Sequence, residues 1–120
     1  MRRTIVIAAL ALALAAAAAS AWAHAHLQRS VPAAGSTLAA APSEIRLWFT
    51  QDIEPGLSGI EVLNSAGKRV DKNDAGLGDD RKQLKIALGT IEAGAYQVRW
   101  HAVSVDTHRT EGDFGFTVKP

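Results

Sequence analysis

The residues of this sequence best suited to metal chemistry are its four histidines: His24, His26, His101 and His108. His108 lies two residues after Asp106, and residues i and i+2 of an extended segment project from the same side. A turn or bulge could also bring the carboxylate and the imidazole together. The spacing alone is weak evidence, because a solvated loop pair has the same pattern. His101 falls on the polar face of a predicted strand and is interpreted as an exposed strand residue.

The first 23 residues have the pattern of a secretory signal peptide. Arg2 and Arg3 precede an apolar run over 5–19, and Ala21-Trp22-Ala23 has the small residues that a signal peptidase requires. The run is short of the roughly 20 residues that a membrane anchor needs. We therefore predict cleavage after Ala23 and a mature domain over 24–120. The alternative is a cut after Ala25, which would make His26 the first residue.

Cleavage after Ala23 would give His24 two adjacent nitrogen donors, its α-amine and its imidazole. Together with Asp106 and His108, this makes an amine, two imidazoles and a carboxylate, a nitrogen and oxygen set that suits Cu(II). Zn(II) accepts such ligands too, usually in tetrahedral geometry. The α-amine has a pKa near 8, so a metal must compete with its proton. His26 is a further candidate ligand. Alternatively, it is an outer ligand of the metal or a solvated residue at the edge of a sheet.

Composition narrows the chemistry of the mature domain. The sequence has no cysteine, and its single methionine is Met1, so the exported domain would offer no sulfur ligand. Without Arg2 and Arg3 it has 11 basic and 12 acidic residues, a formal charge of −1. No basic patch points to nucleic acid or to an anionic lipid surface.

Short runs of alternating apolar and polar residues, separated by glycine, proline, asparagine and aspartate, dominate the mature domain. About seven short strands with this spacing predict an immunoglobulin-like antiparallel β-sandwich. The aspartates at 71, 74, 79 and 80 lack the spacing of a calcium loop, and we expect a solvated loop over 71–80. The predicted strands cover 26–31, 43–50, 59–63, 68–70, 83–88, 96–102 and 114–118.

Three stretches carry a resemblance to a known family. They are the start at His24-Ala-His-Leu with Ser30-Val-Pro-Ala-Ala-Gly-Ser36, the run Ile45-Arg-Leu-Trp-Phe-Thr-Gln51, and the segment 94–108 with its Phe116-Thr-Val118 tail. The last contains the pattern W-x-x-V-S-x-D-x-H and is the most specific. The sequence resembles the CopC-type periplasmic copper-binding proteins, and in particular their short YobA-like branch.

The resemblance implies a β-sandwich that binds one Cu(II) ion through the amine and side chain of His24, with Asp106 and His108. It also implies a role in copper tolerance or delivery, often beside an inner-membrane CopD-type partner. Two departures matter. The mature chain has no methionine for the Cu(I) site of some members, and Gln51 stands where some have a glutamate near the copper.

The leading hypothesis is therefore a non-catalytic periplasmic protein that holds or delivers Cu(II) in copper homeostasis and resistance. A copper monooxygenase acting on polysaccharides is a second hypothesis, but the short chain offers no clear exposed aromatic platform. A third hypothesis is an immunoglobulin-like interaction module without a metal.

Overall fold

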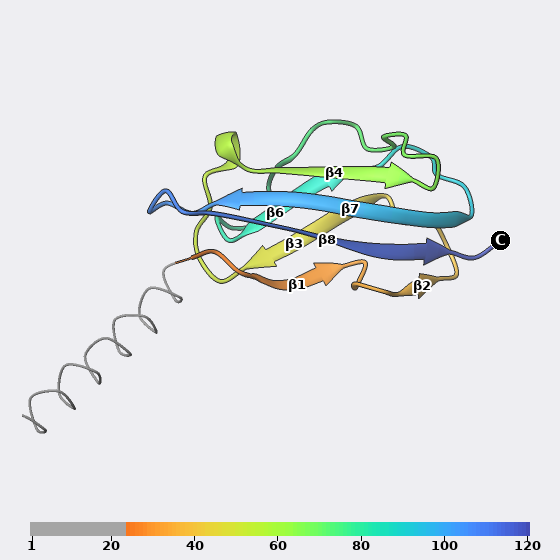
Figure 1. Cartoon of the computed structure of the whole chain (residues 1–120), viewed down its shortest axis with the longest axis horizontal. Helices are drawn as coiled ribbons and strands as arrows, with labels where there is room; N and C mark the ends of the chain where they lie inside the picture. Colours follow the sequence, from red (N-terminus) through yellow and green to blue (C-terminus); the bar gives the residue numbers. More distant parts are fainter. Residues whose placement is uncertain (1–23) are drawn as a thin grey trace, which may run out of the picture.

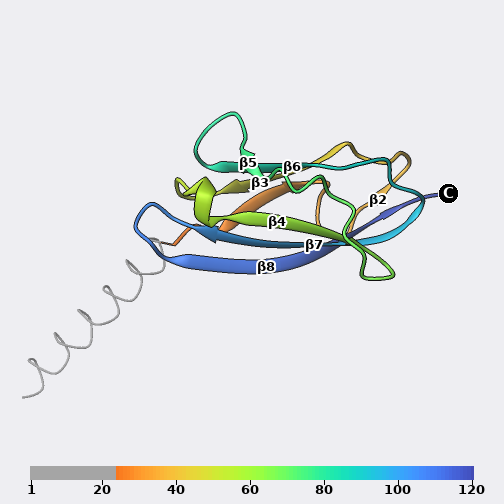
Figure 2. The same ribbon diagram turned by 90° about the horizontal axis from the view of Figure 1, so that it is seen from above.

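The computed structural model describes residues 24–120, so the predicted signal peptide at 1–23 lies outside the described residues. This part of the chain folds into two facing β-sheets (Figures 1 and 2). The strands are β1 (Leu27–Val31), β2 (Thr37–Leu38), β3 (Glu44–Phe49), β4 (Gly59–Asn64), β5 (Gly76–Leu77), β6 (Gln83–Ala87), β7 (Gly94–Val103) and β8 (Arg109–Val118).

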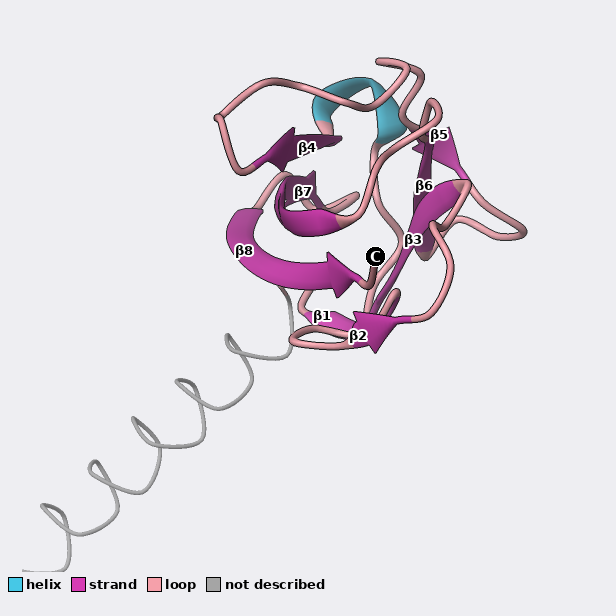
Figure 3. Cartoon of the chain, turned by 90° about the vertical axis from the view of Figure 1, so that its right-hand side faces the viewer, coloured by secondary structure: helices cyan, strands magenta, loops and turns pink. Residues whose placement is uncertain are grey.

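Each sheet has four strands. The first has the order β1-β3-β6-β5 and the second has the order β2-β8-β7-β4. Strand pairs are antiparallel except for β2, which runs parallel to β8 over two residues. Seen end-on, the two sheets form separate layers (Figure 3). The predicted all-β, immunoglobulin-like sandwich is confirmed.

The core lies between the two sheets because each long strand has one apolar face. In β3, Ile45, Leu47 and Phe49 alternate with half-buried residues and are at most 1% exposed. From the opposite sheet, Val98 of β7 and Phe116 of β8 complete the interior. Burial at every second residue is the alternation that the sequence pattern predicted. Burial of these apolar side chains is the main favourable contribution to folding.

Two of the eight strands were not predicted, and one predicted strand is not formed. The unpredicted strands, β2 and β5, have two residues each, too few to show alternation. The predicted strand at 68–70 is reduced to a single bridge between Leu63 and Arg69. The only helix in 24–120 is the short 3₁₀ turn η1 (Pro55–Leu57), and no helix of this part is long and apolar enough to cross a membrane.

The expectation that Asp71 is solvated was wrong. Its side chain has no exposed surface and accepts backbone N–H groups from Val62 and Asn73, each at 2.8 Å. Arg69 Nε donates to both carboxylate oxygens at 2.8 and 2.9 Å. Burial alone would raise the pKa of Asp71, but these hydrogen bonds outweigh it and hold the pKa below 3.8. The carboxylate thus ties the loop to β4.

Candidate metal centre

The connection between β7 and β8 forms a tight turn at one end of the sandwich (Figure 1). The backbone N–H of Ser104 donates to the carbonyl of His108 at 2.9 Å, and that of Thr107 donates to the carbonyl of Ser104 at 2.8 Å. Thr107 has φ of 73°, a left-handed conformation that is uncommon for a β-branched residue. A turn, and not an extended segment, therefore brings Asp106 and His108 to the same side of the chain.

Asp106 and His108 face each other across this turn. The Nδ1 atom of His108 lies 3.2 Å from Oδ2 of Asp106, and both side chains are partly exposed, at 54% and 40%. The buried hydroxyl of Ser104 donates to the other carboxylate oxygen of Asp106. The hydrogen bond from Ser104 lowers the pKa of Asp106 below 3.8, and His108 lowers it further. The carboxyl group is thus held in its ionised form.

The first described residues reach the same end of the molecule. Ala25 has no exposed surface and anchors the segment in the core, and β1 then pairs with β3. On either side of Ala25, His24 is half-buried and His26 is exposed. The ring centroids of His24 and His108 are 4.5 Å apart, although the residues are 84 positions apart in sequence. The fold therefore brings the first histidine to the D-x-H turn.

These residues form a chain of pairwise contacts. His108 contacts His24 on one side and Asp106 on the other, and the ring centroid of His26 lies 6.2 Å from that of His24. Across residues 24–120, no three His, Cys, Asp or Glu side chains already converge as a metal-binding group. In this chain the nitrogen of His24 is still in a peptide bond to Ala23, so the amine that the prediction requires exists only after cleavage.

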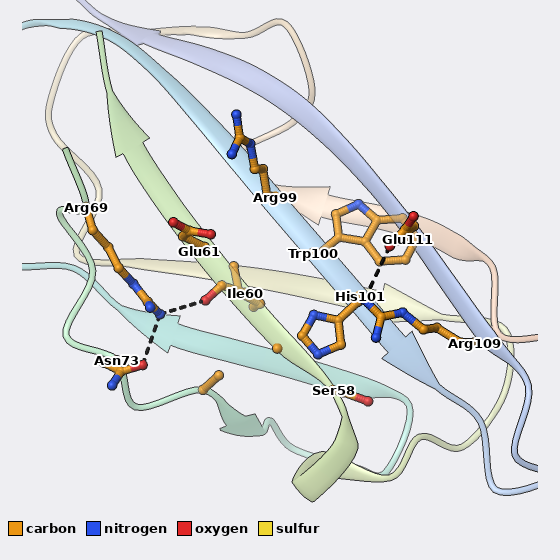
Figure 4. A pocket seen from close by; sticks show the side chains of 12 residues that line it. Ser58, Ile60, Glu61, Arg69, Asn73, Arg99, Trp100, His101, Arg109 and Glu111 are labelled. Carbon is orange, nitrogen blue, oxygen red and sulfur yellow. Dashed lines mark hydrogen bonds and ion pairs between the residues drawn. The ribbon is translucent and has the colours of Figure 1, made fainter. Parts of the chain in front are cut away.

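His101 belongs to a different part of the surface. It lines a hollow of about 480 Å³ on the β4-β7-β8 sheet, together with Arg109 and Glu111 (Figure 4). Its ring lies over Gly59, where an added Cβ would be 2.7 Å from Cε1. His101 is therefore half-buried rather than fully exposed as predicted. Burial lowers its pKa below 6.5, and the positive charge of Arg109 lowers it further.

Sequence reasoning assigned no role to the hydroxyl groups that support the site. Ser104 is 1% exposed, and its Oγ contacts both the Asp106 carboxylate and, at 3.3 Å, the carbonyl of His108. The signal available in the sequence was the serine two residues before the aspartate, a spacing at which short polar side chains often stabilise turns. Gln51, the amide expected to contribute weakly, is half-buried in the loop after β3.

The fold and the contacts at this end of the molecule define a class of protein: a small β-sandwich that carries two histidines and an aspartate close together at one end. The CopC domain model matches residues 27–119. Protein YobA of Escherichia coli K12 is 37% identical over 95 residues, which cover 78% of this chain and 77% of that protein.

Two solved structures are also similar. CopC from Methylosinus trichosporium OB3b has a TM-score of 0.73 and 34% identity, covering 81% of this chain and 95% of that chain. PcoC, a methionine-rich copper resistance protein from Escherichia coli, has a TM-score of 0.72 and 36% identity, covering 81% and 100%. The chain belongs to the CopC family, and the resemblance read from the sequence is confirmed.

Proposed function

We propose that the mature chain, residues 24–120, is a periplasmic protein that binds one Cu(II) ion for copper homeostasis and resistance. The amine and imidazole of His24 would form a chelate, His108 would add a second imidazole, and Asp106 would supply an oxygen. The observation that carries the proposal is the contact between the His24 and His108 rings, at 4.5 Å between centroids. Relatives named for copper resistance or copper transport support it.

The donor set favours Cu(II) for two reasons. Imidazole, amine and carboxylate suit the tetragonal geometry that Cu(II) prefers, whereas Cu(I) prefers thiolate and thioether ligands. The sequence beyond Met1 contains neither methionine nor cysteine. Transfer of one electron from an external one-electron reductant to the bound ion would give Cu(I), which this donor set would hold more weakly, and the released ion could pass to an inner-membrane CopD-type partner. No group in the proposed site needs to act as a catalyst for this role.

The burial of Ala25 supports cleavage after Ala23 rather than after Ala25. Ala25 has no exposed surface and belongs to the core. A cut after Ala25 would remove this buried residue, and it would also remove the histidine ring that contacts His108. His26 would remain an additional ligand or an outer neighbour of the ion, since its ring centroid lies 6.2 Å from that of His24.

The test is Cu(II) binding by the purified 24–120 protein, measured by competition with a chromophoric chelator and by intact mass for stoichiometry. We expect one ion per chain and a higher melting temperature with copper, because a ligand that binds only the folded state stabilises it. Adding one glycine before His24 displaces the amine. Linked donors gain about 10²–10⁴ in avidity, so the extended protein should bind about a hundredfold more weakly.

His108→Ala should also weaken binding strongly, whereas His101→Ala is the matched control because His101 lines a separate hollow. Equal affinity of the glycine-extended and native proteins would show that the amino-terminal chelate is wrong. Absence of any copper effect on binding or melting would favour a metal-free interaction module. Delivery is tested by mixing the loaded protein with membrane vesicles that contain a CopD-type transporter and measuring copper transfer.

A further inference from the structure

Two threonine hydroxyls hold the backbone of the first three described residues. Thr50, immediately after β3, accepts the N–H of His26 at 3.0 Å and donates to the carbonyl of His24 at 3.3 Å. Thr110, in β8, donates to the carbonyl of Ala25 at 2.6 Å. Because β3 and β8 belong to opposite sheets, these hydrogen bonds fasten residues 24–26 to both layers of the sandwich. We call the three hydrogen bonds from Thr50 and Thr110 the clamp.

We infer that Thr50 and Thr110 are positioning residues for the copper site, which hold the His24 ring beside His108 before the metal arrives. The inference rests on the proposed function and extends it to residues that do not touch the ion. Neither threonine is a candidate ligand, since a neutral hydroxyl competes poorly with imidazole and amine for Cu(II). Their effect would come through the backbone of residues 24–26.

Each hydrogen bond restrains a different part of this segment. Ala25 is fully buried, so its carbonyl cannot be hydrated and needs a protein donor, which Thr110 supplies. The bond from Thr50 to the carbonyl of His24 fixes the peptide plane that follows His24. With that plane fixed, the amine and the side-chain torsions of His24 are the main freedoms left to order when copper binds.

The restraint has a defined size. The free-energy cost of ordering the backbone of one residue corresponds to about a tenfold loss of affinity. A segment that is ordered in the folded protein has already lost this entropy, so the ion does not have to order it. Releasing one residue from the clamp should therefore weaken Cu(II) binding by about tenfold.

All three side-chain contacts lie on the carboxyl side of the bond between Ala23 and His24. Cleavage at that bond therefore leaves the clamp intact and adds only the amine. A cut after Ala25 would instead remove the acceptor carbonyls of both threonines, those of His24 and Ala25. The clamp is thus present in the precursor, and two of its three hydrogen bonds require His24 and Ala25.

The experiment compares the Cu(II) affinity and dissociation rate of Thr50→Val, Thr110→Val and the corresponding serine variants in the 24–120 protein. Valine keeps the β-branch and removes the hydroxyl, while serine keeps the hydroxyl. We expect about tenfold weaker binding and faster release for each valine variant, with binding by the serine variants within about twofold of native. Thr117→Val is the control, because Thr117 is an exposed residue at the other end of β8.

Two further readouts separate positioning from loss of fold. The electron paramagnetic resonance spectrum of bound Cu(II) should be unchanged in the valine variants, because the ligands are the same. In the unmodified metal-free protein, the amide hydrogen of His26 should exchange slowly, since it donates to Thr50. This second measurement needs no variant, and free exchange of that amide would overturn the clamp even if a valine variant failed to fold.

The outcomes are distinguishable. Tight copper binding by the native protein with equally tight binding by both valine variants would overturn the positioning role and leave the proposed function standing. Weak binding that serine does not restore would show that the hydroxyls are not responsible. A native 24–120 protein that binds no copper would refute the proposed function, and the inference would fall with it.

Discussion

Replacing Asp71 by asparagine should destabilise the sandwich far more than its place in an aspartate-rich loop suggests. The carboxylate accepts three donors, the backbone N–H groups of Val62 and Asn73 and the Nε–H of Arg69. Asparagine has nearly the same shape, but one of its two polar atoms is an NH₂ group. That NH₂ group cannot accept a hydrogen bond, so it would leave the backbone N–H of either Val62 or Asn73 without an acceptor.

The magnitude follows from these contacts. Leaving a buried donor unsatisfied costs about 1–3 kcal/mol, and hydrogen bonds to a charged group are stronger than those to a neutral one by about 1 kcal/mol. Asp71→Asn should therefore lower the free energy of unfolding by about 2–4 kcal/mol at neutral pH. For a domain of this size, each 1 kcal/mol corresponds to about 4–8 °C in melting temperature, so Tm should fall by roughly 10–30 °C.

The pH dependence gives a second measurement. The pKa of Asp71 is lower in the folded protein than its ordinary value of 3.8. The stabilisation is therefore fully present above that value and is lost as the pH falls through the lower, folded-state pKa. Thermal melts of the metal-free native and variant proteins should differ most near neutral pH and approach each other in acid below pH 3.8.

Asp113→Asn is the matched control, because Asp113 is exposed and its carboxylate accepts a hydrogen bond from Nε2 of Gln97 at 2.7 Å and from no backbone N–H among the described hydrogen bonds. Its effect should stay within about 0.5 kcal/mol, as is usual for a surface substitution. If Asp71→Asn melts within a degree of the native protein at pH 7, the carboxylate does not fasten the loop. A large difference that stays constant down to pH 2 would assign the loss to shape rather than to charge.

Two further predictions concern β7 and β8. Gly112→Ala would place a Cβ 2.8 Å from Cζ2 of Trp100, so the ring must shift; we expect a loss of about 1–3 kcal/mol and a change in tryptophan emission. Arg109→Gln should raise the pKa of His101, since Arg109 adds to the lowering by burial. A proton NMR titration of the His101 ring measures this, and an unchanged or lower pKa would contradict it. Because the folded pKa lies below 6.5, the stability linked to His101 falls as the pH drops below 6.5, and the variant should show a shallower fall.

The long strands could be predicted because alternation and burial have the same cause. Ile45, Leu47 and Phe49 point inward because every second residue of β3 faces the opposite sheet. The two-residue strands β2 and β5 have no such period and exist only because longer strands lie beside them. Asp71 could not be predicted as buried, because its partner Val62 lies nine residues away and is brought close only by the fold.

The site divides in the same way. His24, Asp106 and His108 could be named from residue type and from the family motif, and their roles as ligands stay a prediction. The meeting of His24 with His108 depends on the hairpin formed by the two ten-residue strands β7 and β8 and on the burial of Ala25. The hydroxyl contacts depend on turn geometry, which a single sequence does not specify.

The β7 and β8 hairpin also sets how the protein can be handled. Arg109 begins β8 beside the His108 turn, and Val118 ends it nine residues later, a span of about 30 Å at roughly 3.3 Å per residue. The carboxyl terminus accordingly lies at the end of the sandwich opposite the turn between β7 and β8 (Figure 1), where the His24 ring contacts His108. A linker, an affinity tag or a sensor surface attached after Pro120 would therefore leave the end that carries His24 and His108 open to solvent. The same handle placed before His24 would occupy the very nitrogen whose chemistry is to be measured.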